Sequence, residues 1–190
     1  MATGDHSFSC SCGAFAGHIP ADAQKSGLRL VCFCPDCRAA ELYHRQPDPI
    51  EGVDLFQVAP HAVTITQGAE HLRLLRLGPK GLFRWYAGCC GTPIANTLSK
   101  PKLAFAGLRS DLFDSKEALG KVKARAHVVR AGKPPRNEGM PRMVYGIFSR
   151  MIIARLSGMW RQTPFFDLET GKPVVAPEVI SKETRAGLYP

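Results

Sequence analysis

The chain has 190 residues, a formal net charge of +9 at pH 7 and a hydrophobic content of 45%. This length and composition exclude a disordered chain and a small cystine-stapled domain, and they favour one folded unit with a sizeable core. We expect a cytoplasmic, reducing location, because the N-terminus lacks the basic and apolar regions of a signal peptide and no stretch reaches the ~18 apolar residues of a membrane span.

Short strands joined by turns are predicted over the first two-thirds of the chain. The candidate strands, in order, are residues 15–19, 27–31, 55–58, 62–66, 71–77, 82–86 and 126–129. A helical turn or two is expected at 39–44, a hairpin turn at 78–81, a helix start at 114–119, and a loop at 131–139, where Gly, Pro and Asn accumulate. The fold class that this pattern predicts is mainly β.

The C-terminal residues are predicted to form a helix followed by a hairpin or extended arm. Pro141 stands at a favoured first helical position, and an amphipathic helix is expected over about 141–160. The hairpin or arm is expected over 163–175. We divide the chain into a domain of residues 1–130, which holds all the cysteines, and a C-terminal extension of residues 131–190 that packs on it. The helix either packs its apolar face on its own domain or contacts a second copy to form a homodimer, and membrane contact is not favoured.

Charge is distributed unevenly along the chain. Residues 1–60 hold 4 Lys/Arg and 7 Asp/Glu, for a net charge of −3, and residues 61–190 hold 21 and 9, for a net charge of +12. Residues 116–142 alone hold 8 Lys/Arg and 2 Asp/Glu. This basic part could meet nucleic acid through phosphate contacts, or it is a solvated surface without a partner.

The seven cysteines carry the chemical information of the sequence. They fall into three groups: Cys10 and Cys12, then Cys32, Cys34 and Cys37, then Cys89 and Cys90. Cysteines one to three residues apart, in groups separated along the chain, are typical of thiolates gathered around zinc. We expect one or two zinc ions.

The central group offers three ligands from one tight loop, Cys32-Phe33-Cys34-Pro35-Asp36-Cys37. Three local ligands with no obvious fourth would leave a coordination position open to a substrate. Arg38 could offset the negative charge of the thiolates, and Asp36 is expected to cap a turn. His44 is the nearest candidate proton carrier in the sequence, although an ordinary surface histidine is the simpler interpretation.

The three groups together resemble the GFA family, which comprises the glutathione-dependent formaldehyde-activating enzyme and its relatives, including centromere protein V. The resemblance covers about residues 7–110 and lies in Cys10-x-Cys12-Gly13, Cys32-x-Cys34-x-x-Cys37 and Cys90-Gly91-Thr92. It implies a mainly β, zinc-binding fold. It also implies a structural zinc site that includes Cys10, Cys12 and Cys90, and a catalytic zinc site formed by Cys32, Cys34 and Cys37.

One ligand of the family's structural site is missing. The family pattern Phe-Cys-x-x-Cys-Gly appears here as Tyr86-Ala87-Gly88-Cys89-Cys90-Gly91, so that Ala87 stands where a cysteine is expected. Cys89 could substitute for it if the backbone turns sharply, which Gly88 and Gly91 would permit. Otherwise water or histidine completes the site, the site holds no metal, or Cys89 serves the other zinc.

Three functions are consistent with these features. The resemblance favours a zinc-dependent carbon–sulfur lyase that acts on a small thiol–aldehyde adduct such as S-hydroxymethylglutathione, with glutathione as the thiol partner. A zinc-stabilised binding module, contacting nucleic acid through the basic C-terminal half, is the alternative. A redox or metal-handling protein with exposed thiolates is the third.

Overall fold

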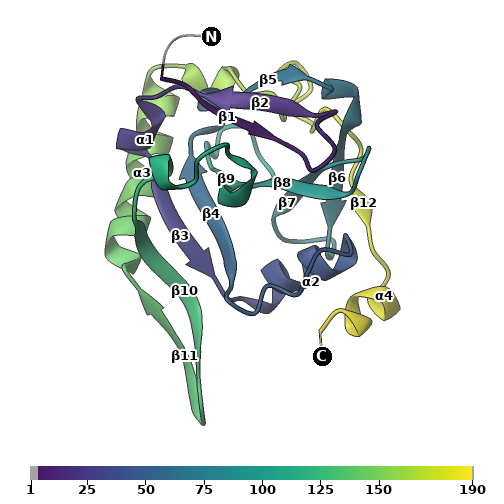
Figure 1. Cartoon of the computed structure of the whole chain (residues 1–190). Coiled ribbons are helices and arrows are strands. Elements are labelled where there is room, and N and C mark those ends of the chain that lie inside the picture. The colour runs from purple at the N-terminus through teal and green to yellow at the C-terminus, as the bar shows by residue number, and fades with distance from the viewer. Residues whose placement is uncertain (1–3, 190) are drawn as a thin grey trace.

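Two β-sheets form the body of the protein in the computed structural model, which describes residues 4–189 (Figure 1). The smaller sheet has the order β1-β2-β5, and the larger has the order β11-β10-β3-β4-β9-β8-β7-β6-β12. The strands are β1 (His6–Ser9), β2 (Ala16–Ile19), β3 (Leu28–Cys32), β4 (Val53–Val58), β5 (Thr64–Gln67), β6 (Leu72–Arg76), β7 (Phe83–Ala87), β8 (Thr92–Thr97), β9 (Ala106–Arg109), β10 (Val122–Arg130), β11 (Lys133–Glu138) and β12 (Glu178–Val179). The prediction of a mainly β fold with a C-terminal helix is confirmed.

The main core lies between the two sheets. Phe8 and Phe15 come from the smaller sheet and its β1–β2 turn, and they pack in one cluster with Phe56 and Trp85 of the larger sheet. All four side chains are at most 1% exposed. The indole N–H of Trp85 donates to Thr97 Oγ1 at 2.9 Å, so its one polar group is satisfied within the core.

Four α-helices accompany the sheets within the described part of the chain: α1 (Ala23–Ser26), α2 (Pro35–Tyr43), α3 (Met140–Leu156) and α4 (Lys182–Gly187). Helix α2 begins earlier than the predicted turn at 39–44, because Cys34 caps it and Pro35 occupies its first turn. Helix α3 ends at Leu156 rather than near residue 160, and a short 3-10 helix, η5 (Met159–Arg161), follows it. No helix within residues 4–189 is long and apolar enough to cross a membrane.

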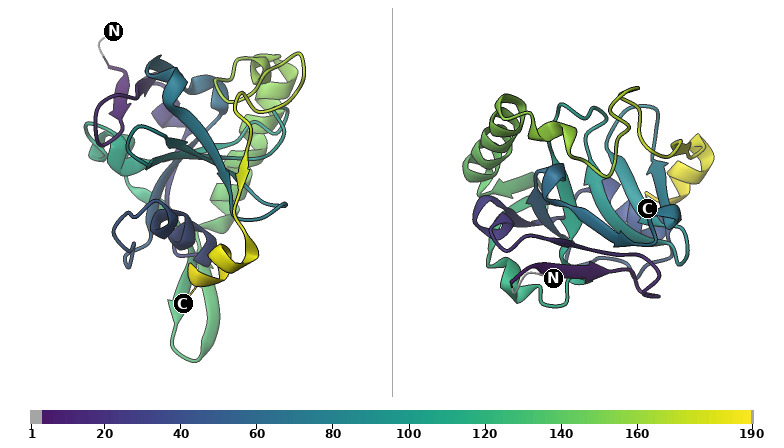
Figure 2. Two further views of the ribbon diagram at one scale, coloured as in Figure 1. Left: turned by 90° about the vertical axis from the view of Figure 1, so that its right-hand side faces the viewer. Right: turned by 90° about the horizontal axis from the view of Figure 1, so that it is seen from above.

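Helix α3 lies on the opposite side of the molecule from β1 and β2 (Figure 2). It packs against β10 and buries Ala154 and Arg150, whose guanidinium donates to the Ser26 carbonyl at 2.7 Å. Much of its apolar surface faces outward. The exposed large hydrophobic side chains of α3 are Val144, Tyr145, Phe148, Ile152, Ile153 and Leu156.

The prediction of a loop at 131–139 is wrong. Strands β10 and β11 form an antiparallel hairpin that turns at Gly132, where φ is 65°, and that projects from the body of the molecule (Figures 1 and 2). The two prolines of β11 are typical of a loop in the sequence. However, β11 is an edge strand of the larger sheet, where proline is tolerated. The hairpin crosses the boundary drawn at residue 130. Strands β1, β8, β9 and β12 were not predicted, because β1, β9 and β12 are short and β8 lacks strong alternation.

The C-terminal segment returns to the body as the expected hairpin and arm. Val174 donates its backbone N–H to the Phe165 carbonyl at 3.1 Å, and Phe165, 1% exposed, packs on Trp85. Strand β12 then adds to the edge of the larger sheet, parallel to β6. Helix α4 follows and lies beside α2 (Figure 1), where the Tyr189 hydroxyl donates to Asp36 at 2.5 Å.

Candidate metal centres

Four thiols from distant parts of the chain converge at one place. The Sγ atoms of Cys10, Cys12, Cys89 and Cys90 all lie within 4.8 Å of one another. The separations are 3.5 Å for Cys10–Cys12, 3.8 Å for Cys10–Cys89, 3.5 Å for Cys12–Cys89 and 3.9 Å for Cys89–Cys90. A tetrahedron of sulfurs about 2.3 Å from zinc has edges of about 3.8 Å, so this donor set fits a closed zinc site.

A sharp turn lets two adjacent cysteines join this cluster. The N–H groups of Cys90 and Gly91 both donate to the Ala87 carbonyl, and Gly91 has a φ of 73°. The chain therefore turns just after β7 instead of continuing as a strand, in which neighbouring side chains point to opposite faces. Cys89 thus lies with Cys10, Cys12 and Cys90, which is the arrangement that the first of the sequence alternatives, substitution of Cys89 for a cysteine at position 87, required.

Polar groups surround the four-cysteine cluster. The backbone N–H of Phe15 donates to Cys10 Sγ at 3.3 Å, and the Thr92 hydroxyl lies 3.0 Å from Cys90 Sγ and 2.8 Å from the Ser11 hydroxyl. Burial raises the pKa of Cys90, but hydrogen bonds from Ser11 and Thr92 outweigh it and bring the pKa to about 5. Hydrogen bonds of this kind stabilise thiolates as metal ligands.

The second cluster consists of the Sγ atoms of Cys32, Cys34 and Cys37, which also lie within 4.8 Å of one another. Cys32 ends β3, Cys34 is the N-cap of α2, and Cys37 lies in the first turn of that helix. The backbone N–H of Cys37 donates to Cys34 Sγ at 3.3 Å, so the cap and the cluster are one structure. Three converging thiols fit a zinc ion and leave a fourth tetrahedral position for another group.

The charge of this cluster is concentrated on one sulfur. Hydrogen bonds from the Cys32 and Cys37 thiols lower the pKa of Cys34 to about 2, and the same cluster raises the pKa of Cys32 to about 11. Arg84, 6% exposed, lies with its Nη1 4.0 Å from Cys37 Sγ and also lowers the pKa of Cys34. Arg38, suggested by the sequence for this role, is instead paired with Asp48 at 2.6 Å.

A cavity of about 290 Å³ opens beside the three-cysteine cluster, and all three cysteines line it. The remaining lining residues are Leu30, Asp36, Leu55, Gln57, Leu82, Arg84, Asn96, Phe105, Gly107, Ala126, His127, Asn137, Met140 and Met143. These residues come from seven strands of the larger sheet and the loops before them, from α2 and from α3. The sequence indicated the cysteines but not this cavity, because its walls are distant from the cysteine loop along the chain.

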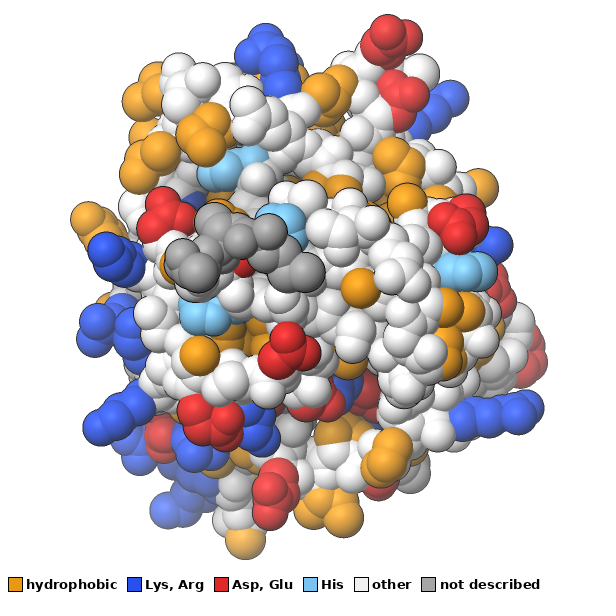
Figure 3. All heavy atoms as spheres, turned by 45° about the horizontal axis from the view of Figure 1, so that its top comes forward, with side chains coloured by type: hydrophobic (Ala, Val, Ile, Leu, Met, Phe, Trp, Pro, Cys, Tyr) orange, Lys and Arg blue, Asp and Glu red, His pale blue; other side chains and the backbone are white. Residues whose placement is uncertain are grey.

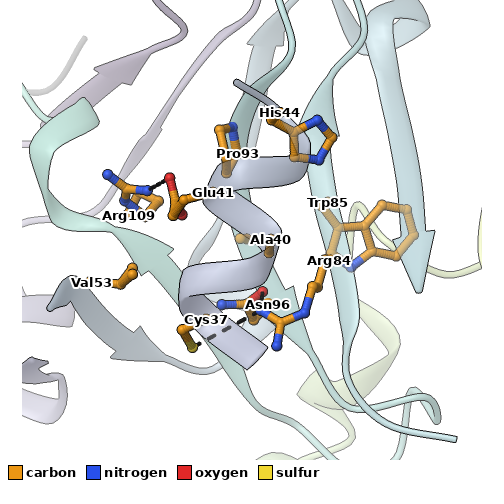
Figure 4. A pocket seen from close by; sticks show the side chains of 11 residues that line it. Cys37, Ala40, Glu41, His44, Val53, Arg84, Trp85, Pro93, Asn96 and Arg109 are labelled. Carbon is orange, nitrogen blue, oxygen red and sulfur yellow. Dashed lines mark hydrogen bonds and ion pairs between the residues drawn. The ribbon is translucent and has the colours of Figure 1, made fainter. Parts of the chain in front are cut away.

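His44 does not lie at the three-cysteine cluster. It follows α2 directly and lies seven positions after Cys37, which corresponds to about 10 Å along the helix axis. Figure 4 shows Cys37 and Arg84 near one end of α2 and His44 at the other. Burial lowers the pKa of His44 to about 4, so the ring is neutral at pH 7. The ring packs against Tyr86 at a centroid distance of 4.3 Å and an interplanar angle of 41°.

His127, which sequence proximity did not recommend, does line the cavity. It lies in β10 at a register shift of the hairpin, with a φ of 58°, and its backbone N–H donates to Asn137 Oδ1 at 2.8 Å. Bulges of this kind redirect side chains beside functional sites. No local signal in the sequence places His127 here, because β10 reaches the cysteines through its parallel pairing with β3.

Helix α2 is attached to the sheet by a buried ion pair. Glu41 is 4% exposed, and its carboxylate pairs with the Arg109 guanidinium of β9, which also contacts Asp111 at 2.6 Å. Burial raises the pKa of Glu41, and Arg109 opposes that rise. The pair lies beside a small, water-sized space between α2 and the sheet, with Cys37 on another side of it (Figure 4).

The fold and the two clusters define a mainly β protein whose thiols are grouped for metal binding. A model of the family described as "Family of unknown function (DUF6151)" matches residues 5–177, so the chain belongs to this family. A search of the curated proteins found no match. Among solved structures, the chain is similar to the crystal structure of a Rhodobacter sphaeroides protein, with 18% identity, coverage of 61% of this chain and 96% of that chain, and a TM-score of 0.43.

Proposed function

We propose that the protein is a zinc protein with two sites of different roles. Cys10, Cys12, Cys89 and Cys90 would hold a structural ion with a complete set of four ligands. The cluster of Cys32, Cys34 and Cys37 would hold an ion with an open position. The observation that carries this distinction is the cavity of about 290 Å³, which is lined by the three-cysteine cluster and not by the four-cysteine one.

The proposed reaction is carbon–sulfur bond making or breaking in a small thiol–aldehyde adduct such as S-hydroxymethylglutathione. A zinc ion bound at the open site would supply Lewis-acid chemistry, lowering the pKa of a thiol and polarising an aldehyde carbonyl. When such an adduct breaks down, the sulfur keeps the electron pair of the C–S bond and the hydroxyl proton leaves as the carbonyl forms. His127 is the candidate to accept that proton, because its side chain lines the cavity.

The chain's other residues support this chemistry. Arg84 places a buried positive charge beside the thiolates, which offsets the net charge of a three-thiolate zinc site. Apolar side chains make up most of the cavity wall and limit the access of water.

Metal analysis of the purified protein and its variants tests the two-site proposal. We expect two zinc ions per chain by mass spectrometry, and one in each of the variants Cys34→Ala and Cys12→Ala. Cys89→Ala should match Cys12→Ala, because Cys89 supplies a ligand to the same cluster. If the wild type binds one zinc ion per chain and Cys34→Ala still binds it, the proposal of a catalytic zinc site at the three-cysteine cluster is wrong.

Activity is tested by following formaldehyde by NMR, with glutathione and with small alkyl thiols in turn, in the presence of the zinc-loaded protein. We expect adduct formation or breakdown above the uncatalysed rate, lost in Cys34→Ala and kept in Asp48→Asn, a change outside the cavity. Rates equal to the uncatalysed one with all tested thiols would contradict the lyase proposal.

A second candidate function, nucleic-acid binding, is favoured by the β10–β11 hairpin. Its exposed basic side chains are Lys121, Lys123, Arg125, Arg130, Lys133 and Arg136, and residues 121–136 include no Asp or Glu. Figure 3 shows Lys and Arg side chains along the left-hand edge of the molecule, the side on which Figure 1 places α3, β10 and β11.

Salt-dependent binding of duplex DNA, measured by fluorescence anisotropy, tests this alternative. Each phosphate contact contributes about 0.9 to the slope of log K against log salt. Arg130→Gln together with Arg136→Gln should reduce the slope by about 2, whereas Lys172→Gln, on the distant C-terminal hairpin, should leave it unchanged. Equal slopes for all three proteins would rule out the hairpin as a phosphate-binding surface.

A further inference from the structure

One face of the larger sheet forms the floor of the cavity beside the three-cysteine cluster, and a polar row crosses it. The strand register sets Gln57 of β4 opposite Gly107 of β9, and Gly107 opposite Asn96 of β8. Asn96 in turn lies opposite Arg84 of β7. All four residues line the cavity. Since neighbouring strands are about 4.8 Å apart, the Cα atoms of Gln57 and Asn96 are about 10 Å apart, with a glycine between them.

The Gln57 side chain is the unsatisfied member of this row. Gln57 is only 5% exposed, and its Oε1 has no hydrogen-bond partner among residues 4–189. Asn96, by contrast, accepts a hydrogen bond from Arg84 at 3.3 Å. A buried amide without a partner is rare and unfavourable, and a ligand in the cavity would supply what the protein does not.

Gly107 keeps a gap open between the two amides. A Cβ added at Gly107 would meet only Phe105 Cζ, at 3.7 Å, within a 4 Å radius. The space above the glycine therefore belongs to the cavity, and a bound molecule can pass over it to reach Gln57.

The walls indicate what kind of molecule fits. The cavity is predominantly apolar, because its walls include Leu30, Leu55, Leu82, Met140 and Met143. Among the lining residues, Arg84 is the one Lys or Arg, and its guanidinium already contacts Cys37 and Asn96. Asp36 adds a negative charge. Carboxylates such as the two of glutathione find no free cation inside this cavity, whereas alkyl groups find apolar walls.

We propose that this cavity binds an apolar thiol that carries one uncharged hydroxyl or amide group, with the thiol at the three-cysteine cluster and the polar group paired with the Gln57 amide. This inference rests on the proposed function, because it assumes that the three-cysteine cluster holds an ion with an open position, and it replaces glutathione by an apolar thiol as the thiol of the proposed adduct. An amide side chain both donates and accepts, so it can pair with a hydroxyl or with an amide. Gln57 is then a specificity-determining residue, and Gly107 keeps the passage open.

Calorimetric titration of the zinc-loaded protein tests the role of Gln57, with 4-mercaptobutan-1-ol, butane-1-thiol and glutathione as probes. We expect the wild type to bind 4-mercaptobutan-1-ol about three- to tenfold more tightly than butane-1-thiol, the range of one neutral hydrogen bond. Glutathione should bind most weakly. Gln57→Leu should reverse or abolish the preference for the hydroxyl without lowering thermal stability, since it removes an unpaired buried amide.

Gly107→Val tests the passage. The branched side chain suits a strand and would enter the cavity, so binding of both alkyl thiols should weaken at least tenfold while the zinc content stays unchanged. Gly107→Ala is the milder variant should valine disturb folding. Gly187→Ala is the control, because an added Cβ there meets nothing within 4 Å and Gly187 lies in α4, outside the cavity.

The outcomes separate the two levels of the proposal. Equal binding of the two alkyl thiols, an unchanged preference in Gln57→Leu, or tightest binding of glutathione would overturn the inference while leaving the zinc site in place. Absence of zinc from the three-cysteine cluster would instead remove the proposed function and this inference with it. Thiol binding that persists in Cys34→Ala would place the thiol elsewhere and overturn the inference.

Discussion

Cys89 shows how one backbone turn decides the role of a side chain. On a continuing strand it would point away from Cys90, but the turn after Ala87 brings both sulfurs to one cluster, 3.9 Å apart. Cys89 thereby joins Cys10, Cys12 and Cys90, and the cluster has four thiols.

His44 provides a prediction about pH at the same scale. The unfolded chain takes up a proton near the ordinary pKa of 6.5, whereas burial lowers the pKa of His44 in the folded protein to about 4. The free energy of unfolding should therefore fall as the pH is lowered from about 6.5 to about 4, and this contribution should be constant below that range. The full shift corresponds to about 3 kcal/mol, and partial exposure of the ring reduces the expected loss to about 1–2 kcal/mol.

Urea unfolding of the wild type and of His44→Phe at pH 7 and pH 5 measures this effect. Phenylalanine keeps a ring in contact with Tyr86 but does not titrate, so the variant should lose less stability between the two pH values. Acid release of metal affects both proteins alike, and the difference between them isolates His44. Identical losses in the two proteins would show that His44 titrates normally in the folded state.

At the scale of elements, α2 is the helix that positions the three-cysteine cluster. Cys34 caps α2, Cys37 lies in its first turn, and the helix packs on the larger sheet. Its attachment combines the buried pair of Glu41 and Arg109 with the C-terminal arm, where the Tyr43 hydroxyl donates to Glu178 at 2.7 Å and the Tyr189 hydroxyl contacts Asp36. The last residues of the chain therefore help to hold the cysteine loop in place.

Breaking the Glu41–Arg109 pair from one side should be more harmful than replacing both partners. Arg109→Met leaves a carboxylate that is 4% exposed without its cation, and we expect a loss of about 3–5 kcal/mol in the free energy of unfolding. Glu41→Leu combined with Arg109→Met should recover much of that loss.

A double-mutant cycle in urea measures this coupling, with zinc content recorded for each protein. Asp111→Asn is the control, because Asp111 contacts Arg109 from an exposed position. Additive effects of the two single changes would mean that the pair is not energetically coupled.

At the scale of the whole molecule, the exposed face of α3 is the feature that lacks a partner among residues 4–189. Tyr145, Phe148, Ile152 and Leu156 follow one face of the helix and are 76%, 59%, 56% and 83% exposed. A contiguous apolar stripe of this size is uncommon on a surface that meets only water. We expect two copies of the chain to pack through it.

Size-exclusion chromatography with light scattering tests this expectation. The wild type should elute as a dimer, and Phe148→Glu with Ile152→Glu should elute as a monomer with its zinc content unchanged. Arg142→Glu changes the charge of an exposed position at the start of the same helix and should remain dimeric. A monomeric wild type at micromolar concentration would contradict the dimer.

The separation into residues 1–130 and 131–190 does not describe how the molecule is held together. Phe165 and Phe166 belong to the same core cluster as Trp85, and β10 pairs with both β3 and β11. The extension is thus part of the main core and of the main sheet, which a change in composition along the sequence does not reveal.

The sequence by itself determined the features that depend on neighbours along the chain. The mainly β character and the cysteine loop from Cys32 to Cys37 follow from local patterns, because a three-ligand loop is closed by residues a few positions apart. The turn at Cys89 was one of several alternatives that Gly88 and Gly91 permitted. The helix near residue 141 was likewise found from its proline start, with an error of a few residues at its end.

Only the tertiary structure decided which distant residues meet. It brings Cys10 and Cys12 together with Cys89 and Cys90. It also places the row of Gln57, Gly107, Asn96 and Arg84 beside the three-cysteine cluster. It also excluded His44 from that cluster and brought His127 to its cavity. The physical reason is strand register: a pairing between distant strands fixes which side chains share a face, and no local propensity encodes that register.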